Sequence, residues 1–266
     1  MTEYTDHYGP EGLRTRGTII VVPGRGETRA TYARFGKRLA ADAYRVRVID
    51  APDLYSTDAE ADAGANGDLT GSLTRFGAQL ADAVEDTAGQ DDTVRPVVVV
   101  GADTGAAAVA ALLGRHRTTD ARLPDAVVLA GLPGHNSATS GGSWGDELDI
   151  RTSCPVHRGT LTDDSEVRRG SLDEAAPEVL LTAAYDSELA VPALILIGDA
   201  DPLADSDALV RTVKAQTRAR LSVVRGAHHD VLNDVQHRSV AAEIVTFLET
   251  LRNELVPVIA IESSAW

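Results

Sequence analysis

The sequence predicts an α/β fold: a mainly parallel sheet with helices on both of its faces. Runs of β-branched residues alternate with longer amphipathic or alanine-rich segments, which is the pattern of repeated strand-helix units. Several runs are almost continuous Val, Ile and Leu, as expected for strands that are covered on both faces. The 266 residues fit one large domain of this class.

Six strands and five helices are expected, each from its local apolar pattern. The strands are expected at residues 18–22, 45–49, 96–101, 126–131, 193–198 and 220–224. The helices are expected at residues 31–42, 73–87, 104–113, 206–216 and 235–252, where apolar residues recur at helical spacing.

Two stretches interrupt the alternation. Residues 52–70 are acidic, rich in Ala and Gly and without an apolar period, which predicts an exposed loop. Residues 132–191 separate two strands by far more than a crossover requires, and we expect a lid insertion over the carboxyl ends of the strands. Short helical fragments are expected within it, including residues 174–184; a disordered linker is the alternative. The core domain is then formed by residues 1–131 and 192–266.

The composition and charge of the chain argue against several classes of protein. A net charge of −15 disfavours binding to nucleic acid, and no run of apolar residues is long enough to span a membrane. The first 17 residues lack the basic start and apolar stretch of a secretory signal, and the single cysteine, Cys154, excludes an internal disulfide. We therefore expect a cytoplasmic protein that acts on a small molecule.

The strongest chemical signal is the sequence Gly-Ala-Asp-Thr-Gly at residues 101–105, between a predicted strand and a predicted helix. Its context and its small residues fit a nucleophile elbow, G-x-S-x-G, with Asp103 in place of the serine. The alternative is that Asp103 only caps the helix.

Two further segments supply an acid and a histidine in the expected chain order. Asp201 follows the strand at residues 193–198, with Asp199 and Asp205 as competitors, and His229 follows the last strand in the sequence Gly-Ala-His-His. Nucleophile, acid and histidine follow one another in this order in one large fold family. We expect Asp103, Asp201 and His229 to converge at the sheet edge.

These motifs resemble those of the α/β-hydrolase superfamily. The sequence Pro-Gly-Arg-Gly-Glu at residues 23–27 also resembles the H-G-x-G-E turn of the monoacylglycerol-lipase and lysophospholipase branch, with Pro23 replacing the histidine. The resemblance implies an oxyanion hole formed by the backbone N–H groups of Arg25 and Thr104. A plain tight turn is the alternative. Because so few residues precede the first strand, the antiparallel strands that open this fold should be short or missing.

The carboxylate at residue 103 changes the expected chemistry. Attack on an ester would give a mixed anhydride, whereas attack on a strained or activated saturated carbon gives an ordinary alkyl ester. An aspartate at this elbow resembles epoxide hydrolases and haloalkane dehalogenases, which implies that His229, oriented by Asp201, activates water against the ester.

Help for the leaving group is harder to assign. Dehalogenases of this type commonly carry Trp after the nucleophile, where this chain has Thr104, so only Trp144 in the lid insertion could substitute. Epoxide hydrolases use lid tyrosines, for which Tyr185 is the candidate, with His135 or His157 as a second acid. We therefore expect Trp144 and Tyr185 to contact substrate, and epoxide opening is favoured over halide displacement.

Other activities stay open at this point. The fold also supports lyases, cyclases and cofactor-free oxygenases, in which Asp103 and His229 would act as a base and a positioning group. An esterase-like hydrolase and a ligand-binding protein without catalysis are further alternatives. No motif indicates a cofactor or a metal. The apolar tail at residues 255–261 alternates in character, which predicts pairing with another strand or a second copy of the chain.

Overall fold

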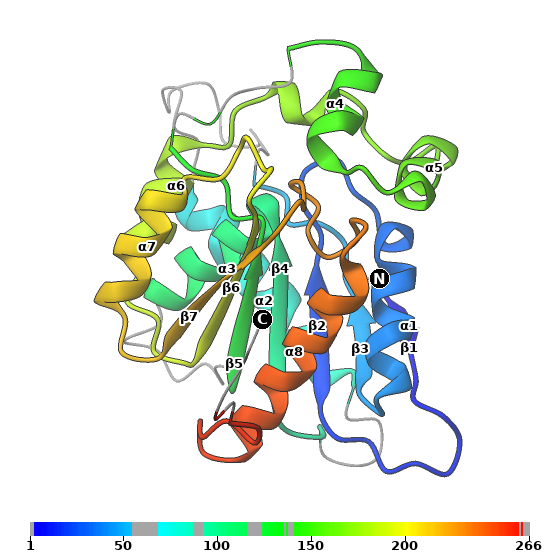
Figure 1. Cartoon of the computed structure of the whole chain (residues 1–266), viewed down its shortest axis with the longest axis vertical. Coiled ribbons are helices and arrows are strands. Elements are labelled where there is room, and N and C mark those ends of the chain that lie inside the picture. The colour runs from blue at the N-terminus through cyan, green and yellow to red at the C-terminus, as the bar shows by residue number, and fades with distance from the viewer. Residues whose placement is uncertain are drawn as a thin grey trace.

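The computed structural model describes residues 3–54, 69–87, 93–115, 124–135, 137, 141–260 and 262. One sheet lies between two layers of helices (Figure 1). Its strand order is β1-β3-β2-β4-β5-β6-β7, and every neighbouring pair is parallel except β1 with β3. The predicted α/β fold class is confirmed.

All predicted strands form, with ends that differ from prediction by at most one residue. The strands are β1 (Thr5–His7), β2 (Thr18–Val22), β3 (Arg45–Val48), β4 (Val97–Ala102), β5 (Ala126–Ala130), β6 (Ala193–Gly198) and β7 (Ala219–Val224). The strand that the pattern did not predict, β1, is short and antiparallel. It matches the expectation that the opening strands are reduced.

The helices of the two outer layers also follow the apolar spacing. They are the 3-10 helix η1 (Arg29–Tyr32), α1 (Ala33–Ala41), α2 (Leu69–Glu85), α3 (Asp103–Arg115), α7 (Ser206–Ala215) and α8 (His237–Arg252). The expected loop at residues 52–70 is wrong at its end, because Leu69 packs against the core and starts α2. Residues 55–68 of that loop lie outside the described residues.

The core consists of two apolar layers, one on each face of the sheet. Successive valines of β4 alternate between them: Val99 packs with α2, α3 and α7, whereas Val98 and Val100 pack with α1 and α8. Because both faces are covered, the central strands are apolar throughout, and polar side chains gather at their carboxyl ends.

The segment predicted to form a lid, residues 132–191 and still called the lid insertion, has helices in two parts of the fold. Its helices α4 (Trp144–Arg151) and α5 (Pro155–Asp163) lie above the carboxyl ends of the strands (Figure 1), where Leu148, Leu161 and Val167 form a separate small cluster. The short helix η3 (Ser171–Asp173) follows. Helix α6 (Glu178–Tyr185) instead joins the main core beside α3.

Helix α6 starts later than the predicted residues 174–184. Pro177 occupies its N-cap with an extended backbone, and a proline disfavours helical geometry in the residue before it. The proposed domain boundary at residues 132 and 191 stays a prediction.

The C-terminal tail does not form the expected strand in its described part. Within residues 255–260 the backbone turns, with Leu255 N–H donating to Thr250 O at 2.8 Å, and Val258 and Ile259 are exposed. Pairing with a second copy stays a prediction. No helix in the described ranges is long and apolar enough to cross a membrane.

Candidate active site

Asp103 occupies the predicted elbow at the junction of β4 and α3. Its φ is 47°, in the left-handed region that residues with a side chain seldom adopt. The turn requires glycine on both sides: a Cβ at Gly101 would lie 2.7 Å from Ala106 Cα, and one at Gly105 would meet the carbonyl oxygen of Pro23. The backbone thus turns the Asp103 side chain out from the end of the strand.

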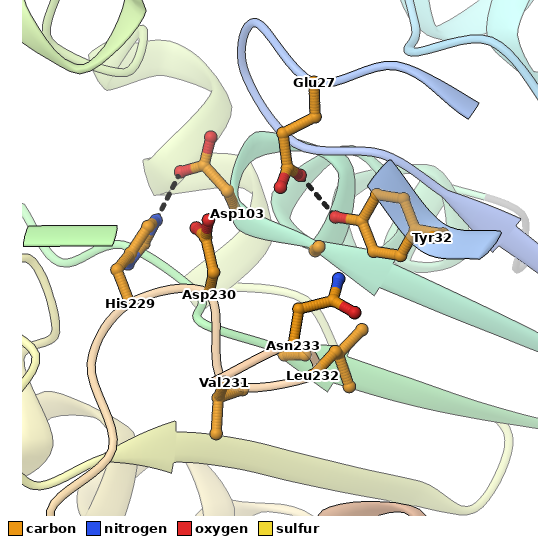
Figure 2. Close-up of a pocket in the computed structure, with 10 residues that line it drawn as sticks. Glu27, Tyr32, Asp103, His229, Asp230, Val231, Leu232 and Asn233 are labelled. Carbon is orange, nitrogen blue, oxygen red and sulfur yellow. Dashed lines mark hydrogen bonds and ion pairs between the residues drawn. The ribbon is translucent and has the colours of Figure 1, made fainter. Parts of the chain in front are cut away.

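The three predicted side chains converge there. His229 Nε2 lies 3.2 Å from Asp103 Oδ1 (Figure 2), and His229 Nδ1 lies 2.9 Å from Asp201 Oδ2. His229 comes from the loop between β7 and α8, where its N–H donates to Ile150 O at the end of α4 at 3.1 Å. The helix-cap alternative does not describe Asp103, because its carboxylate bonds to segments outside its own helix.

The structure also distinguishes the three candidate acids. Asp205 caps α7, where its Oδ1 accepts from Ala208 N–H at 2.8 Å. The Asp201 side chain is buried, and its second oxygen accepts from Leu203 N–H at 2.9 Å, which fixes the carboxylate toward His229. Asp199 is exposed and accepts from the N–H of Gly226 instead. Only Asp201 reaches the histidine.

Arg25 and Thr104 both contact Asp103 Oδ2. The backbone N–H of Arg25 donates to this oxygen at 2.9 Å. Thr104 contacts the same oxygen through its hydroxyl, at 3.4 Å, whereas the resemblance implied its backbone N–H. An oxyanion hole formed by these two residues stays a prediction.

The Arg25 side chain is the main feature that sequence reasoning missed. Its Nε lies 2.8 Å from Asp103 Oδ2 and its Nη2 lies 2.9 Å from Asp103 Oδ1, so the guanidinium donates hydrogen bonds to both carboxylate oxygens. Both side chains are at most 5% exposed. The available signal was electrostatic: a carboxylate buried at an elbow needs a cation, and Arg25 lies in the adjacent turn.

The charges of this site shift the pKa values of its members. Burial raises the pKa of Asp103, but the charge of Arg25 and the hydrogen bonds of His229 and Arg25 outweigh it and hold that pKa well below its ordinary value. Burial lowers the pKa of His229, but Asp201 and Asp103 outweigh it and raise that pKa to about 10. At neutral pH the site therefore contains an aspartate and an imidazolium.

A second buried acid, Glu27, lies at the end of the same turn as Arg25. Its Oε2 accepts from Gly24 N–H at 2.9 Å and from the hydroxyl of Tyr32 (Figure 2). Burial and the charge of Asp230 raise the pKa of Glu27 to about 7. The glutamate was visible in the motif at residues 23–27, but the motif gave it no role.

Arg151, at the end of α4, connects the lid insertion to this turn. Its guanidinium lies 3.0 Å from Glu147 Oε1 and 3.5 Å from Asp230 Oδ1, and donates to Arg25 O at 2.8 Å. Ligand atoms of Glu27, His157 and Asp230 lie within 4.8 Å of one another, the one such group among the described residues. Arg151 already supplies positive charge to Asp230, and His157 Nε2 bonds to it at 2.8 Å. This group therefore holds together without a metal.

The predicted lid contacts, Trp144 and Tyr185, have hydrogen-bond partners within residues 132–191. Trp144 packs on the small apolar cluster of the insertion, and its Nε1 donates to Thr162 Oγ1 at 3.2 Å. The Tyr185 hydroxyl donates to Pro133 O at 3.2 Å, and its ring lies 5.1 Å from that of His135. As substrate contacts, Trp144 and Tyr185 stay predictions.

Comparison with solved structures identifies the fold of this chain. No family model matches the chain, and no curated protein matches its sequence. Among solved structures, a soluble variant of monoglyceride lipase from Saccharomyces cerevisiae aligns with a TM-score of 0.70 at 14% identity, covering 93% of this chain and 91% of that one.

Two further solved structures have a similar fold. The monoacylglycerol lipase of Paleococcus ferrophilus aligns with a TM-score of 0.68 at 15% identity, over 94% of this chain and 99% of that one. The enol-lactonase of Burkholderia xenovorans LB400 aligns with a TM-score of 0.63 at 16% identity, over 93% and 97%. The chain has the α/β-hydrolase fold.

Proposed function

We propose that this protein is a hydrolase in which Asp103 attacks a saturated carbon of a small organic molecule, opening an epoxide or displacing a halide. One observation carries the proposal: the elbow presents a carboxylate, with His229 Nε2 at 3.2 Å from it and Asp201 at 2.9 Å behind the histidine. A nucleophile, a base and the group that orients the base are the elements of covalent hydrolysis.

The two oxygens of Asp103 have different surroundings, which suits two different tasks. Oδ1 faces His229, whereas Oδ2 accepts from the backbone N–H of Arg25. In our proposal Oδ1 forms the bond to carbon, and Oδ2 becomes the carbonyl oxygen of the enzyme ester. When water adds to that ester, negative charge develops on Oδ2, where the N–H of Arg25 already donates.

Because the pKa of His229 is raised, its imidazolium can give the proton that the opening of an epoxide requires. As Asp103 attacks an epoxide, the carbon–oxygen bond of the ring breaks and the ring oxygen takes the proton of the imidazolium. Ester formation removes the charge of Asp103, which lowers the pKa of His229 and frees the neutral imidazole to accept a proton from water. For a halide, the anion leaves and the imidazolium proton goes to solvent.

Arg25 has to release Asp103 during this cycle. Its guanidinium holds both carboxylate oxygens, which lowers their nucleophilicity, so substrate binding must displace at least one of these bonds. Once displaced, the guanidinium is a cation beside the reacting carbon and stabilises a departing halide or alkoxide. In our proposal Arg25 therefore assists the leaving group, in addition to any substrate contact made by Trp144 or Tyr185.

The test is to trap the ester. Replacing His229 with Gln should leave a halide substrate able to alkylate Asp103 but should block hydrolysis, so that the ester accumulates. Intact-protein and peptide mass spectrometry after incubation with bromoacetate, a halide that needs no proton from His229 to leave, should locate the added mass on the peptide that contains Asp103. The neighbouring His228→Gln variant, matched in chemistry, should accumulate no adduct.

A second candidate is favoured by the ion pair itself. A carboxylate whose two oxygens are both held by an arginine suits a positioning group or a base, as in a lyase, cyclase or cofactor-free oxygenase. Turnover of a substrate without any adduct in the His229→Gln variant would support this class. The lipases and the enol-lactonase of similar fold keep an esterase-like hydrolase as a third candidate, and turnover of para-nitrophenyl acetate that depends on Asp103 would support it.

A further inference from the structure

A small cavity borders Asp103 and His229 on the side of the loop that follows His229 (Figure 2). It has about 10 Å³ of room for the centre of a water molecule, which is what a single bound water requires. Its polar walls come from three segments of the chain: Glu27 and Tyr32, then Asp103, then His229, Asp230 and Asn233.

Asn233 provides the observation that points to a ligand. The residue is 1% exposed, and its Oδ1 has no hydrogen-bond partner among the described residues. Its backbone is fixed, because its N–H donates to Asp230 O at 2.8 Å and its carbonyl accepts from Arg34. A buried amide oxygen left unsatisfied costs about 1–3 kcal/mol, so a water that donates to it stabilises the fold.

Glu27 forms the opposite wall. Its carboxyl group lines the cavity, and the hydrogen bonds from Gly24 N–H and the Tyr32 hydroxyl are both accepted by Oε2. Because its pKa is near 7, its carboxyl presents either a donor or an acceptor at neutral pH. The cavity is therefore lined by the carboxyl group of Glu27 and the amide of Asn233, and buried waters usually have two to four such polar partners.

We propose that this cavity binds one water molecule and that Glu27 and Asn233 position it for attack on the Asp103 ester. This rests on the proposed function. Water oxygen bonds to Asp103 Cγ while one proton passes to His229 Nε2. The bond between Asp103 Cγ and Oδ1 then breaks, and Oδ1 takes that proton and leaves with the product as its alcohol oxygen. The second water proton passes from the new carboxyl group to the neutral His229, which restores the Asp103 carboxylate and the imidazolium.

A kinetic test separates the two chemical steps. Asn233→Leu keeps the side-chain size but removes the amide, so alkylation of Asp103 should stay within about twofold of wild type. Hydrolysis of the ester should slow by about 10- to 100-fold, because the water loses its orientation. Rapid-quench mass spectrometry should therefore show the adduct accumulating, whereas Asn253→Leu, at an exposed position, should behave as wild type.

The conservative Asn233→Asp variant, which keeps an oxygen in the cavity, should recover most of the hydrolysis rate and guards against a folding defect in the leucine variant. A high-resolution crystal structure of the wild type should show water within hydrogen-bond distance of Asn233 Oδ1. Absence of that water, or hydrolysis of the adduct at the wild-type rate in Asn233→Leu, would overturn the inference alone. If no variant, including His229→Gln, ever forms an adduct while substrate turns over, the proposed function fails and the positioning role fails with it.

Discussion

Two buried arginines lie at the carboxyl edge of the sheet, and they differ in what their partners have to do. Arg25 forms an ion pair with Asp103, the residue proposed to react. Arg151 forms ion pairs with Glu147 and Asp230 and so connects the lid insertion to the core. In the proposed cycle the first ion pair has to open during each turnover, whereas the cycle requires no change in the second. Burial and charge pairing alone therefore do not distinguish a reactive site from a structural one; the neighbours of the carboxylate do.

The largest expected effect comes from removing the reactive carboxylate. Asp103→Asn should lower kcat by about 10⁴-fold or more, because an amide cannot form the ester. It should also destabilise the fold by about 3–5 kcal/mol, because Arg25 is left buried without a countercharge. Activity assays with denaturant unfolding check both effects. Activity within about tenfold of wild type would contradict the role of Asp103.

The next effect concerns the acid behind the histidine. Asp201→Asn should keep the fold and lower kcat by about 10²- to 10⁴-fold, because His229 loses the charge that orients it and raises its pKa. The matched control is Asp199→Asn, whose side chain bonds only near the surface, and it should change kcat less than about threefold. Equal losses in the two variants would show that the acid is misassigned.

The contrast between the arginines is tested by removing each. Arg151→Met should cost about 3–5 kcal/mol of unfolding free energy, because Glu147 and Asp230 lose their buried countercharge. The exposed Arg158–Asp149 pair in the same insertion is the control, and Arg158→Met should cost less than about 1 kcal/mol. Denaturant titrations of both variants settle the comparison.

Arg25→Met should instead change the pH dependence of the reaction, because Arg25 contacts the carboxylate that is proposed to react. Because Arg25 holds the pKa of Asp103 down, its removal raises that pKa, and the acidic limb of the rate of Asp103 alkylation should move to higher pH. Arg151→Met should move that limb less, because Arg151 interacts with Asp103 through its charge but does not hydrogen-bond to it in the structure. If both variants move the limb equally, the distinction between the two arginines is wrong.

The smallest effects are in the dependence of stability on pH. The pKa of His229 is raised from 6.5 to about 10, so its contribution is complete below pH 6.5 and is lost as the pH rises to about 10. Asp234, which accepts from Thr152 and Ser153 of the insertion, has a pKa lowered from 3.8 to about 2, so its contribution is complete above pH 3.8 and is lost as the pH falls to about 2. Thermal melting should show His229→Gln flattening the alkaline decline and Asp234→Asn flattening the acidic one.

The sequence predicted the parts of this molecule in which backbone geometry restricts residue type. The strands follow from unbroken apolar runs, and the elbow at Asp103 follows from glycines that the turn requires. The loops of Asp201 and His229 could be ordered along the chain because each follows a recognisable strand.

What the sequence could not predict are contacts made by long side chains across the fold. Arg25 and Arg151 reach carboxylates from other segments, and Asn233 faces the cavity from a loop with no motif. Local pattern carries no information about such distances. For the same reason the sequence placed Trp144 and Tyr185 in the predicted lid insertion but could not show whether their side chains reach Asp103.

The central claim is that Asp103 becomes covalently attached to its substrate, and a single turnover in heavy-oxygen water tests it most directly. With wild-type enzyme in excess over an epoxide or halide substrate, water attacks the ester carbonyl, so the label should enter the Asp103 carboxylate first. Peptide mass spectrometry should find the heavy oxygen on the peptide that contains Asp103, and the first product should be largely unlabelled at its new hydroxyl. Label that appears directly in the product, with none in Asp103, would contradict the account.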